Sequence, residues 1–373
     1  MRTLAWLPLA LLLTACGPAD DGGEPADDGG DLSESLGGAS PDPGFARATE
    51  PREFRFPYDH GAHPAYRNEW WYVTGNFEDQ AGRRYGMQLT LFRIALAPER
   101  EGQRPSAWAT NQAWMGHLAL TDVAGDRFHH AERFARGGEL GLAGTQRDPV
   151  RVWLEDWRLE RVPSGAWRLR AGTDEFGVEL TLDPQKAPVL QGEDGLSQKS
   201  AESGNASYYY SLTRLAAEGS VRLKNAERSV TGSAWLDREW STSALGPEQA
   251  GWDWFALQLD DGTDVMIYHL RREDGAPSRF SAGVVVGPEG DPHHLGPGDF
   301  EIEVLDRWRA PDGPEYPSRW RVEVPGVDGP LMVVPVRADQ ELQVSVRYWE
   351  GAVDVLRGDE SVGHGYVELT GHE

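Results

Sequence analysis

The sequence predicts an all-β protein built from antiparallel sheets that close into barrels or sandwiches. Apolar residues alternate with a period of two along several segments, the pattern of strands with one buried face. Examples are Met87, Leu89 and Leu91; Phe176, Val178, Leu180 and Leu182; and Leu342, Val344, Val346 and Tyr348. No segment shows a sustained helical period, and 44 glycines and 25 prolines interrupt the apolar runs. Short strands separated by turn residues are typical of antiparallel β architectures.

Residues 1–15 have the form of a secretory signal peptide, with Arg2 at the start and an apolar run that ends at Leu13. This run is too short to span a bilayer as a helix, which takes roughly 20 residues. The ending Leu13-Thr14-Ala15-Cys16 resembles the lipobox of bacterial lipoproteins, in which the cysteine carries the lipid. Cys16 is also the single cysteine of the chain, so no disulfide forms within it. We therefore expect lipidation at Cys16.

Residues 16–46 predict a disordered, acidic linker. From Gly17 to Phe45 the chain has eight acidic residues, no Lys or Arg and few apolar residues, so it cannot bury enough surface to fold. The formal net charge of the whole chain is −24, which argues against nucleic acid as a partner. Gly17 after the cysteine is similar to the outer-membrane sorting pattern of Gram-negative lipoproteins. The expected location is thus the periplasmic face of the outer membrane.

The remaining residues are more than one ordinary core holds, so two domains are expected. A faint repeat agrees: Trp71-Tyr72-Val73 and Trp254-Phe255-Ala256 each lead through an acidic, glycine-containing turn to a second apolar run. Asp261-Gly262 is a strong hairpin signal, because both turn positions accept positive φ. We place the domains at 47–228 and 229–373, because residues 224–228 break the apolar pattern.

The usual signatures of nucleophilic hydrolases, zinc peptidases, phosphate-binding loops and dinucleotide folds are missing. His60 and His63 lie in one loop, but no cysteine or third histidine has metal-ligand spacing with them. We therefore expect no metal and no cofactor.

Aromatic residues are dense, with 15 Trp, 11 Tyr and 11 Phe. Consecutive aromatics on a strand face both sides of a sheet, so some must line a barrel interior or a domain seam. One interpretation is a cavity for an apolar ligand, and the other is core packing with an inter-domain interface. The candidate ligand-binding residues are Trp71, Trp235, Trp240, Trp252 and Trp254.

Asp237-Arg238-Glu239 places two carboxylates on one strand face and an arginine on the other, between Trp235 and Trp240. A carboxyl held among aromatic rings is desolvated, which raises its pKa and lets it transfer a proton near neutral pH. The same three residues also suit an ordinary ion-pair network. Asp237 and Glu239 are therefore candidate acids.

Several motifs together resemble the AttH and carotenoid 1,2-hydratase-like (hydroxyneurosporene synthase-like) lipocalin-related family. They lie at 56–64, 68–75, 190–192, 205–211, 234–240 and 365–371, and include Glu69-Trp70-Trp71-Tyr72 and Asp237-Arg238-Glu239-Trp240. The resemblance covers residues 50–373 and implies two lipocalin-like β-barrels in tandem. Members are often described as secreted hydrolases, and their genes tend to lie beside those of ABC-transporter permeases.

In the hydratase branch, the resemblance implies addition of water to a terminal alkene, with a carboxylic acid as the proton donor. That branch has an Asp-His-Asn-Trp run and a later Tyr-x-Asp pair. Here Arg238 replaces the histidine, and Leu270 follows Tyr268-His269 where the second acid belongs. Tyr268 and Trp240 match, and Asp237, Glu239 or His269 would have to replace the missing donor.

Our functional interpretation is a lipid-anchored envelope protein that binds or hands over an apolar or amphipathic, lipid-like molecule, with an ABC-transporter permease as a further partner. One alternative is an acid-base hydratase or hydrolase that acts on an apolar terpenoid or lipid. Another is an interaction module without a small ligand.

Overall fold

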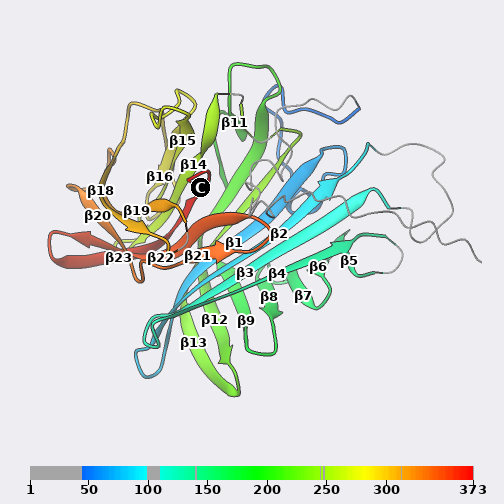
Figure 1. The fold of residues 1–373 in the computed structure, drawn as a ribbon. Helices are drawn as coiled ribbons and strands as arrows, with labels where there is room; N and C mark the ends of the chain where they lie inside the picture. Colours follow the sequence, from blue (N-terminus) through cyan, green and yellow to red (C-terminus); the bar gives the residue numbers. More distant parts are fainter. Residues whose placement is uncertain are drawn as a thin grey trace, which may run out of the picture.

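The computed structural model describes residues 44–98, 110–138, 141–243, 245–246, 248–311 and 313–372. The predicted signal peptide, Cys16 and nearly all of the acidic linker lie outside these residues. Two antiparallel sheets make up the described chain, together with one short 3-10 turn at Tyr58–His60 (Figure 1). The described residues form no α-helix, and so none that is long and apolar enough to cross a membrane. The prediction of an all-β fold is confirmed.

The first sheet has 13 strands and closes into a nearly complete barrel. In order across the sheet they are β4 (Arg127–Arg136), β3 (Gln112–Asp122), β2 (Arg84–Ala95), β1 (Asn68–Asp79), β13 (Ala226–Ser241), β12 (Ala206–Leu223), β9 (Phe176–Pro184), β8 (Trp167–Gly172), β7 (Trp157–Arg161), β6 (Val150–Leu154) and β5 (Ala143–Arg147). The short strands β10 (Val189–Leu190) and β11 (Leu196–Gln198) also pair with β12. Strand β6 packs against β2, β3 and β4, which brings the two ends of the sheet together.

The second sheet has 10 strands and forms a half-barrel that contains the C-terminal residues (Figure 1). Its order is β17 (Pro292–Leu295), β16 (Ala282–Val286), β15 (Asp264–Arg272), β14 (Gln249–Leu259), β23 (Glu360–Leu369), β22 (Arg347–Arg357), β20 (Leu331–Pro335), β19 (Glu315–Glu323) and β18 (Glu301–Arg309), with β21 (Glu341–Gln343) paired to β22. A nearly closed barrel followed by a half-barrel agrees with the expected pair of lipocalin-like barrels.

Both predicted hairpins are present. Strands β1 and β2 pair through the turn at 80–83, and β14 and β15 pair through the turn at 260–263. Strand β13 runs from Ala226 to Ser241 and so spans the boundary expected at residues 228 and 229. It pairs with β1 and β12 and therefore belongs to the first sheet. The second sheet begins at Gln249, with β14.

Each barrel has its own apolar core, and a third apolar layer lies between the sheets. Alternate residues of one strand serve different layers. Trp71 and Val73 of β1 point into the first barrel, whereas Tyr72 packs in the layer between the sheets. On β14, Phe255 belongs to the half-barrel core and Trp254 to the layer between the sheets. Because both faces are buried, the middle of each strand is a continuous apolar run, residues 70–73 on β1 and 254–257 on β14.

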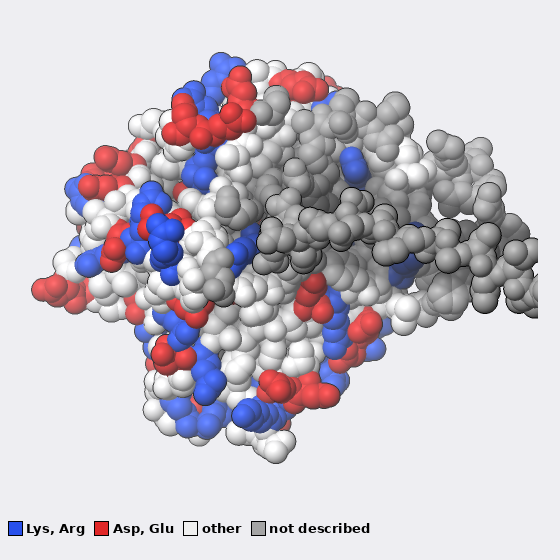
Figure 2. Space-filling view, viewed as in Figure 1, with Lys and Arg blue, Asp and Glu red and all other residues white. Residues whose placement is uncertain are grey.

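The outer surface carries both signs of charge. Acidic and basic side chains intermingle over the face shown in Figure 2. Exposed pairs such as Arg321 with Glu323 and Arg272 with Asp274 illustrate this mixing. Exposed ion pairs of this kind contribute about 0–1 kcal/mol each, so they do not decide the fold.

Candidate functional site

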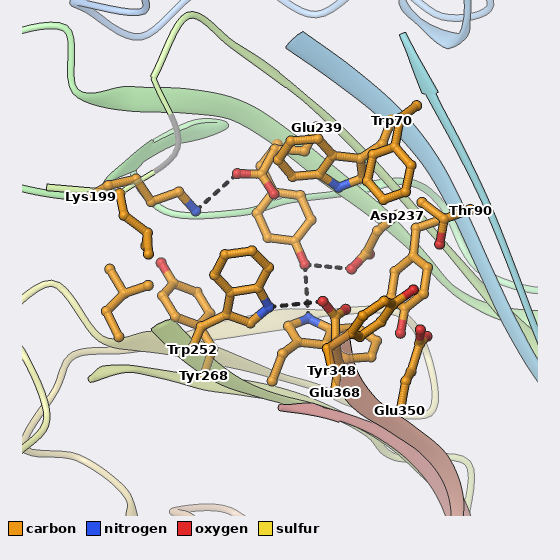
Figure 3. A pocket seen from close by; sticks show the side chains of 16 residues that line it. Trp70, Thr90, Lys199, Asp237, Glu239, Trp252, Tyr268, Tyr348, Glu350 and Glu368 are labelled. Atoms are coloured by element: carbon orange, nitrogen blue, oxygen red, sulfur yellow. Dashed lines mark hydrogen bonds and ion pairs between the residues drawn. The ribbon is translucent and has the colours of Figure 1, made fainter. Parts of the chain in front are cut away.

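A cavity of about 80 Å³ lies between the outer face of the first barrel and the second sheet (Figure 3). Its walls are mostly aromatic, with four carboxyl groups and one ammonium group among them. The lining residues are Trp70, Tyr72, Thr90, Phe92, Lys199, Tyr209, Asp237, Glu239, Leu245, Trp252, Trp254, Tyr268, Leu270, Tyr348, Glu350 and Glu368. Clefts at domain interfaces that combine apolar walls with a few polar groups are common ligand sites.

The register of the first sheet places a row of polar residues on the face that borders the cavity. Directly opposite residues on neighbouring strands point to the same face of a sheet. The row across β12, β13, β1, β2, β3 and β4 is Ser211, Asp237, Tyr72, Thr90, His117 and Glu132. It runs from the centre of the cavity to the edge strand of the sheet.

The second sheet faces this wall with a row of its own. Across β15, β14, β23 and β22 it consists of Tyr268, Trp254, Glu368 and Glu350. The cavity therefore collects carboxyl groups from strands more than 100 positions apart in the sequence, Asp237 on β13 and Glu350 on β22.

Asp237 is 2% exposed and accepts three hydrogen bonds. The donors are the hydroxyls of Tyr209 and Ser211, each at 2.5 Å, and the indole N–H of Trp235 at 2.7 Å. Burial raises the pKa of Asp237 to about 7, because it disfavours the charged form more strongly than the three donors stabilise it. This carboxyl therefore exchanges its proton near neutral pH.

Glu350 and Glu368 are directly opposite each other on β22 and β23. The pKa of each is raised above its usual range, first by burial; the charge of Glu368 raises that of Glu350 further. The indole N–H of Trp252 donates to Glu368 at 3.1 Å (Figure 3). Since two carboxylates this close cannot both ionise easily, the pair retains a proton at neutral pH.

Lys199 and Glu239 form an ion pair in the same cavity, with 2.9 Å between Nζ and Oε1 (Figure 3). Burial alone would lower the pKa of Lys199, but the carboxylate of Glu239 outweighs it and the pKa is raised. The hydroxyl of Ser207 also donates to Glu239. Glu239 is thus held by a cation, whereas Asp237 has only neutral donors.

Arg238 points to the opposite face of β13, as strand alternation predicts. Its guanidinium stacks on Trp71, 3.8 Å from the ring centroid, and donates to Glu69 at 2.9 Å. Glu69 also pairs with Arg93, and these cations hold its pKa far below the usual range even though burial opposes them. Arg238 therefore neutralises a carboxylate inside the first barrel and forms no pair with Asp237 or Glu239.

The cavity can perform acid-base chemistry on a group enclosed by aromatic rings. Asp237 and the pair of Glu350 and Glu368 supply protons near neutral pH, and the ring faces stabilise positive charge. No group of three or more His, Cys, Asp and Glu residues in the described ranges has the geometry of a metal site.

Comparisons with known proteins assign the chain to a family. The AttH-like family model matches residues 47–372. The chain belongs to the AttH-like family. The crystal structure of AttH from Nitrosomonas europaea matches this AttH-like protein with a TM-score of 0.79 and 35% identity, over 88% of this chain and 100% of that one. No curated protein sequence matches it.

Kievitone hydratase from Nectria haematococca has the same fold as this AttH-like protein. The TM-score is 0.64 over 88% of this chain and 98% of that one. The sequence identity is 14%, so the likeness concerns the fold.

The four sequence-predicted catalytic residues of this AttH-like protein do not all meet in the cavity. Asp237, Glu239 and Tyr268 line the cavity, and the Tyr268 hydroxyl lies 3.0 Å from Ser197 Oγ. His269 is on the other face of β15, where its ring stacks on Phe300 of the half-barrel core. Burial lowers the pKa of His269.

The five predicted tryptophans also divide between layers. Trp252 and Trp254 line the cavity, and Trp235 supports it by donating to Asp237. Trp71 and Trp240 point into the first barrel, where Trp240 stacks on His63 at 3.7 Å between ring centroids. His63 also lies 3.0 Å from Asp59, and His60 lies 2.6 Å from the hydroxyl of Tyr210.

Sequence reasoning missed Lys199, Tyr209, Glu350 and Glu368. Tyr209 lies in the family motif at 205–211, and alternation alone leaves open which face of β12 it occupies. Glu368 lies in the family motif at 365–371, between residues with apolar side chains, which was an available signal. Nothing local marks Lys199 or Glu350 as cavity residues.

Proposed function

We propose that this AttH-like protein is an acid-base enzyme that protonates an apolar or amphipathic molecule held between its two sheets. The environment of the Asp237 carboxyl is the observation that carries the proposal. Its carboxyl is buried in an aromatic cavity, and burial raises its pKa to about 7. A general acid works best when its pKa is close to the working pH.

Hydration of a carbon-carbon double bond is the reaction that this arrangement supports best. Asp237 gives its proton to one alkene carbon, and the cation that forms on the other carbon lies between aromatic faces. Water then adds to the cation, and a carboxylate of the cavity takes up the released proton. The resemblance to carotenoid 1,2-hydratases and the fold shared with kievitone hydratase favour the same class. A terpenoid or lipid alkene is the matching substrate.

The test is incubation of the protein with a panel of terpenoid alkenes and prenylated phenols in isotopically labelled water, followed by mass spectrometry. We expect one labelled oxygen in the product of a matching substrate. Asp237→Asn should slow labelling by roughly 10²-fold or more, the scale of a general acid. Glu78→Gln, on an exposed position of β1, is the control. Labelling that is equally fast in Asp237→Asn would contradict the role of Asp237.

A carrier of apolar or amphipathic ligands is the second candidate, and the aromatic lining of the cavity favours it. Such a protein would bind the same compounds without changing them. Binding should quench tryptophan emission, and Trp252→Phe should reduce the quenching while Trp308→Phe, outside the cavity lining, should not. A carrier would bind equally well in the Asp237→Asn variant and yield no labelled product.

We further propose that the protein is a lipoprotein, anchored through Cys16 at the periplasmic face of the outer membrane, and that an ABC-transporter permease is a partner. The signal-like residues 1–15, the lipobox-like run and the Gly17 that follows support the anchor. The family resemblance supports the transporter. Labelled palmitate should be incorporated by the natural chain and not by Cys16→Ser; incorporation by both would refute the anchor.

A further inference from the structure

We propose that Tyr348, His117 and Glu132 form a proton-transfer path from the carboxyl pair in the cavity to solvent at the edge of the first barrel. The proposal builds on the acid-base function above, because a cavity carboxylate that takes up the proton released by water must lose that proton before the next turnover. Its test needs no turnover and therefore stands apart from the test of that function.

Continuous contacts connect the three residues. The Tyr348 hydroxyl lies 2.8 Å from Nδ1 of His117, and Nε2 of His117 lies 3.0 Å from Oε1 of Glu132. Tyr348 lines the cavity together with Glu350, two residues further along β22 and so on the same face of that strand (Figure 3). His117 and Glu132 are directly opposite each other on β3 and β4. The path therefore crosses from the second sheet to the first and then runs along its polar row.

The two ends of the path have different access to water. Glu350 is 0% exposed, and so is His117. The Glu132 side chain is 17% exposed and lies on β4, an edge strand of the first sheet. The backbone N–H of Ser345 donates to Glu132 at 3.1 Å, which holds this carboxylate at the outer end.

The charges along the path determine the hydrogen-bond directions. Burial lowers the pKa of His117 more than the neighbouring Glu132 raises it, so the ring is neutral near pH 7. Burial alone would raise the pKa of Glu132, but hydrogen bonds from His117 and Ser345 lower it and the carboxylate is ionised. A neutral imidazole has one N–H, so Nε2 donates to Glu132 and Nδ1 accepts from Tyr348.

A proton leaves the cavity in three linked steps. The carboxylic proton of Glu350 passes to the hydroxyl oxygen of Tyr348 as the Tyr348 hydroxyl proton passes to Nδ1 of His117. The Nε2 proton of His117 passes to Glu132 at the same time. Glu350 becomes a carboxylate, Glu132 becomes a carboxylic acid, and the other two residues stay neutral. The reverse sequence returns the proton and restores the original tautomer of His117.

The same three residues could serve only as a hydrogen-bonded link between the sheets. The rate of proton exchange in the cavity distinguishes this structural role from a proton-transfer path. The whole protein is transferred to mildly acidic deuterium oxide, and infrared spectroscopy follows deuteration of the buried carboxylic acids through their carbonyl stretch. Glu350→Gln identifies the band of the pair. We expect His117→Phe and Tyr348→Phe to slow exchange of this band by roughly 10²-fold, the lower end of the contribution of a positioned proton-transfer group. Tyr348→Phe keeps the ring and so tests the path even if His117→Phe does not fold.

The matched control is His364→Phe, which removes another imidazole between the sheets. His364 lies 2.7 Å from Ser233 and does not line the cavity. Deuteration of the buried carboxylic acids in His364→Phe should be as fast as in the natural protein. In a His117→Gly variant, added imidazole should restore fast deuteration. Wild-type exchange in a folded His117→Phe or Tyr348→Phe variant would overturn the path, as would equal slowing in His364→Phe. Slow exchange in the variants with no labelled product from any alkene would leave the path standing and the hydratase proposal refuted.

Discussion

At the scale of single residues, Asp237 and Glu69 show how environment decides the chemistry of a carboxyl. Both are buried, and burial by itself would raise the pKa of each. Glu69 has Arg93 and Arg238 beside it and is ionised, whereas Asp237 has only neutral donors and its pKa rises to about 7. Arg238 neutralises Glu69 and not Asp237, because strand alternation turns its side chain away from the cavity.

The raised pKa of Asp237 predicts a loss of stability as pH rises. The folded protein binds this proton more tightly than the unfolded chain, whose Asp has its ordinary pKa of 3.8. The contribution of Asp237 to the free energy of unfolding is therefore greatest in acid and is lost as pH rises to about 7. From about pH 5 to about pH 8, urea denaturation should show the natural protein losing about 3 kcal/mol relative to Asp237→Asn.

Asp79→Asn is the control for this pH effect. Burial opposes ionisation of Asp79, but the N–H groups of Arg83 and Ala81 and the Arg83 guanidinium hold its pKa below the usual range. Asp79 is thus ionised throughout the interval, and its variant should show no pH trend relative to the natural protein. A pH-independent difference for Asp237→Asn would show that its carboxyl is ionised across the whole range.

At the scale of elements, strand β14 depends on the close approach of β23. Strand β14 is buried on both faces and pairs with β15 on one side and β23 on the other. Gly365 of β23 has no room for a side chain, because a Cβ there would lie 2.4 Å from the Ala256 carbonyl oxygen. Its own carbonyl accepts a hydrogen bond from Asn76 of the first sheet at 3.0 Å.

Gly365→Ala should therefore destabilise the protein by about 1–3 kcal/mol, the usual cost of overpacking. The displaced strand carries Glu368, so binding of the proposed ligand in the cavity should weaken as well. Gly298→Ala is the control, because a Cβ there meets nothing within 4 Å. Denaturation should place this control within about 0.5 kcal/mol of the natural protein. Equal stability of the two variants would mean that β23 can move away without cost.

At the scale of the whole molecule, buried polar contacts join the two sheets around the cavity. Asp264 of the second sheet is 0% exposed and accepts from Lys186 at 2.8 Å and from Arg214 at 3.0 Å, both in the N-terminal part of the chain. Arg84 and Asp354 also pair across the sheets, but both side chains are partly exposed. The cavity therefore lies inside one connected unit.

Asp264→Asn should weaken the contact between the sheets by about 3–5 kcal/mol, because it leaves two cations without their carboxylate. We expect calorimetry to show one unfolding transition for the natural protein and two for the variant, with the half-barrel melting first. Asp354→Asn removes an exposed pair between the same sheets and should cost about 1 kcal/mol or less. A single unshifted transition in Asp264→Asn would show that the contacts of Asp264 with Lys186 and Arg214 do not hold the two sheets together.

The sequence alone determined what depends on neighbours along the chain. The period of two in segments such as Phe176 to Leu182 predicted the all-β fold, because successive side chains of a strand point to opposite faces. The same geometry separated Arg238 from Asp237 and Glu239, and the turn at Asp261-Gly262 predicted the second hairpin. The family resemblance identified the AttH-like family, which the comparisons confirm.

Only the tertiary structure decided which faces meet. Alternation places Trp240 and Asp237 on opposite faces of β13. It does not decide which of the two faces lines the cavity, because that depends on how the second sheet packs against the first. Glu350 and Glu368 join Asp237 through strand pairings between residues far apart in the sequence. Strand β13 likewise joins the first sheet because β1 and β12 pair with it on both sides. Burial, and with it the pKa of Asp237, follows from these distant pairings, which no local pattern encodes.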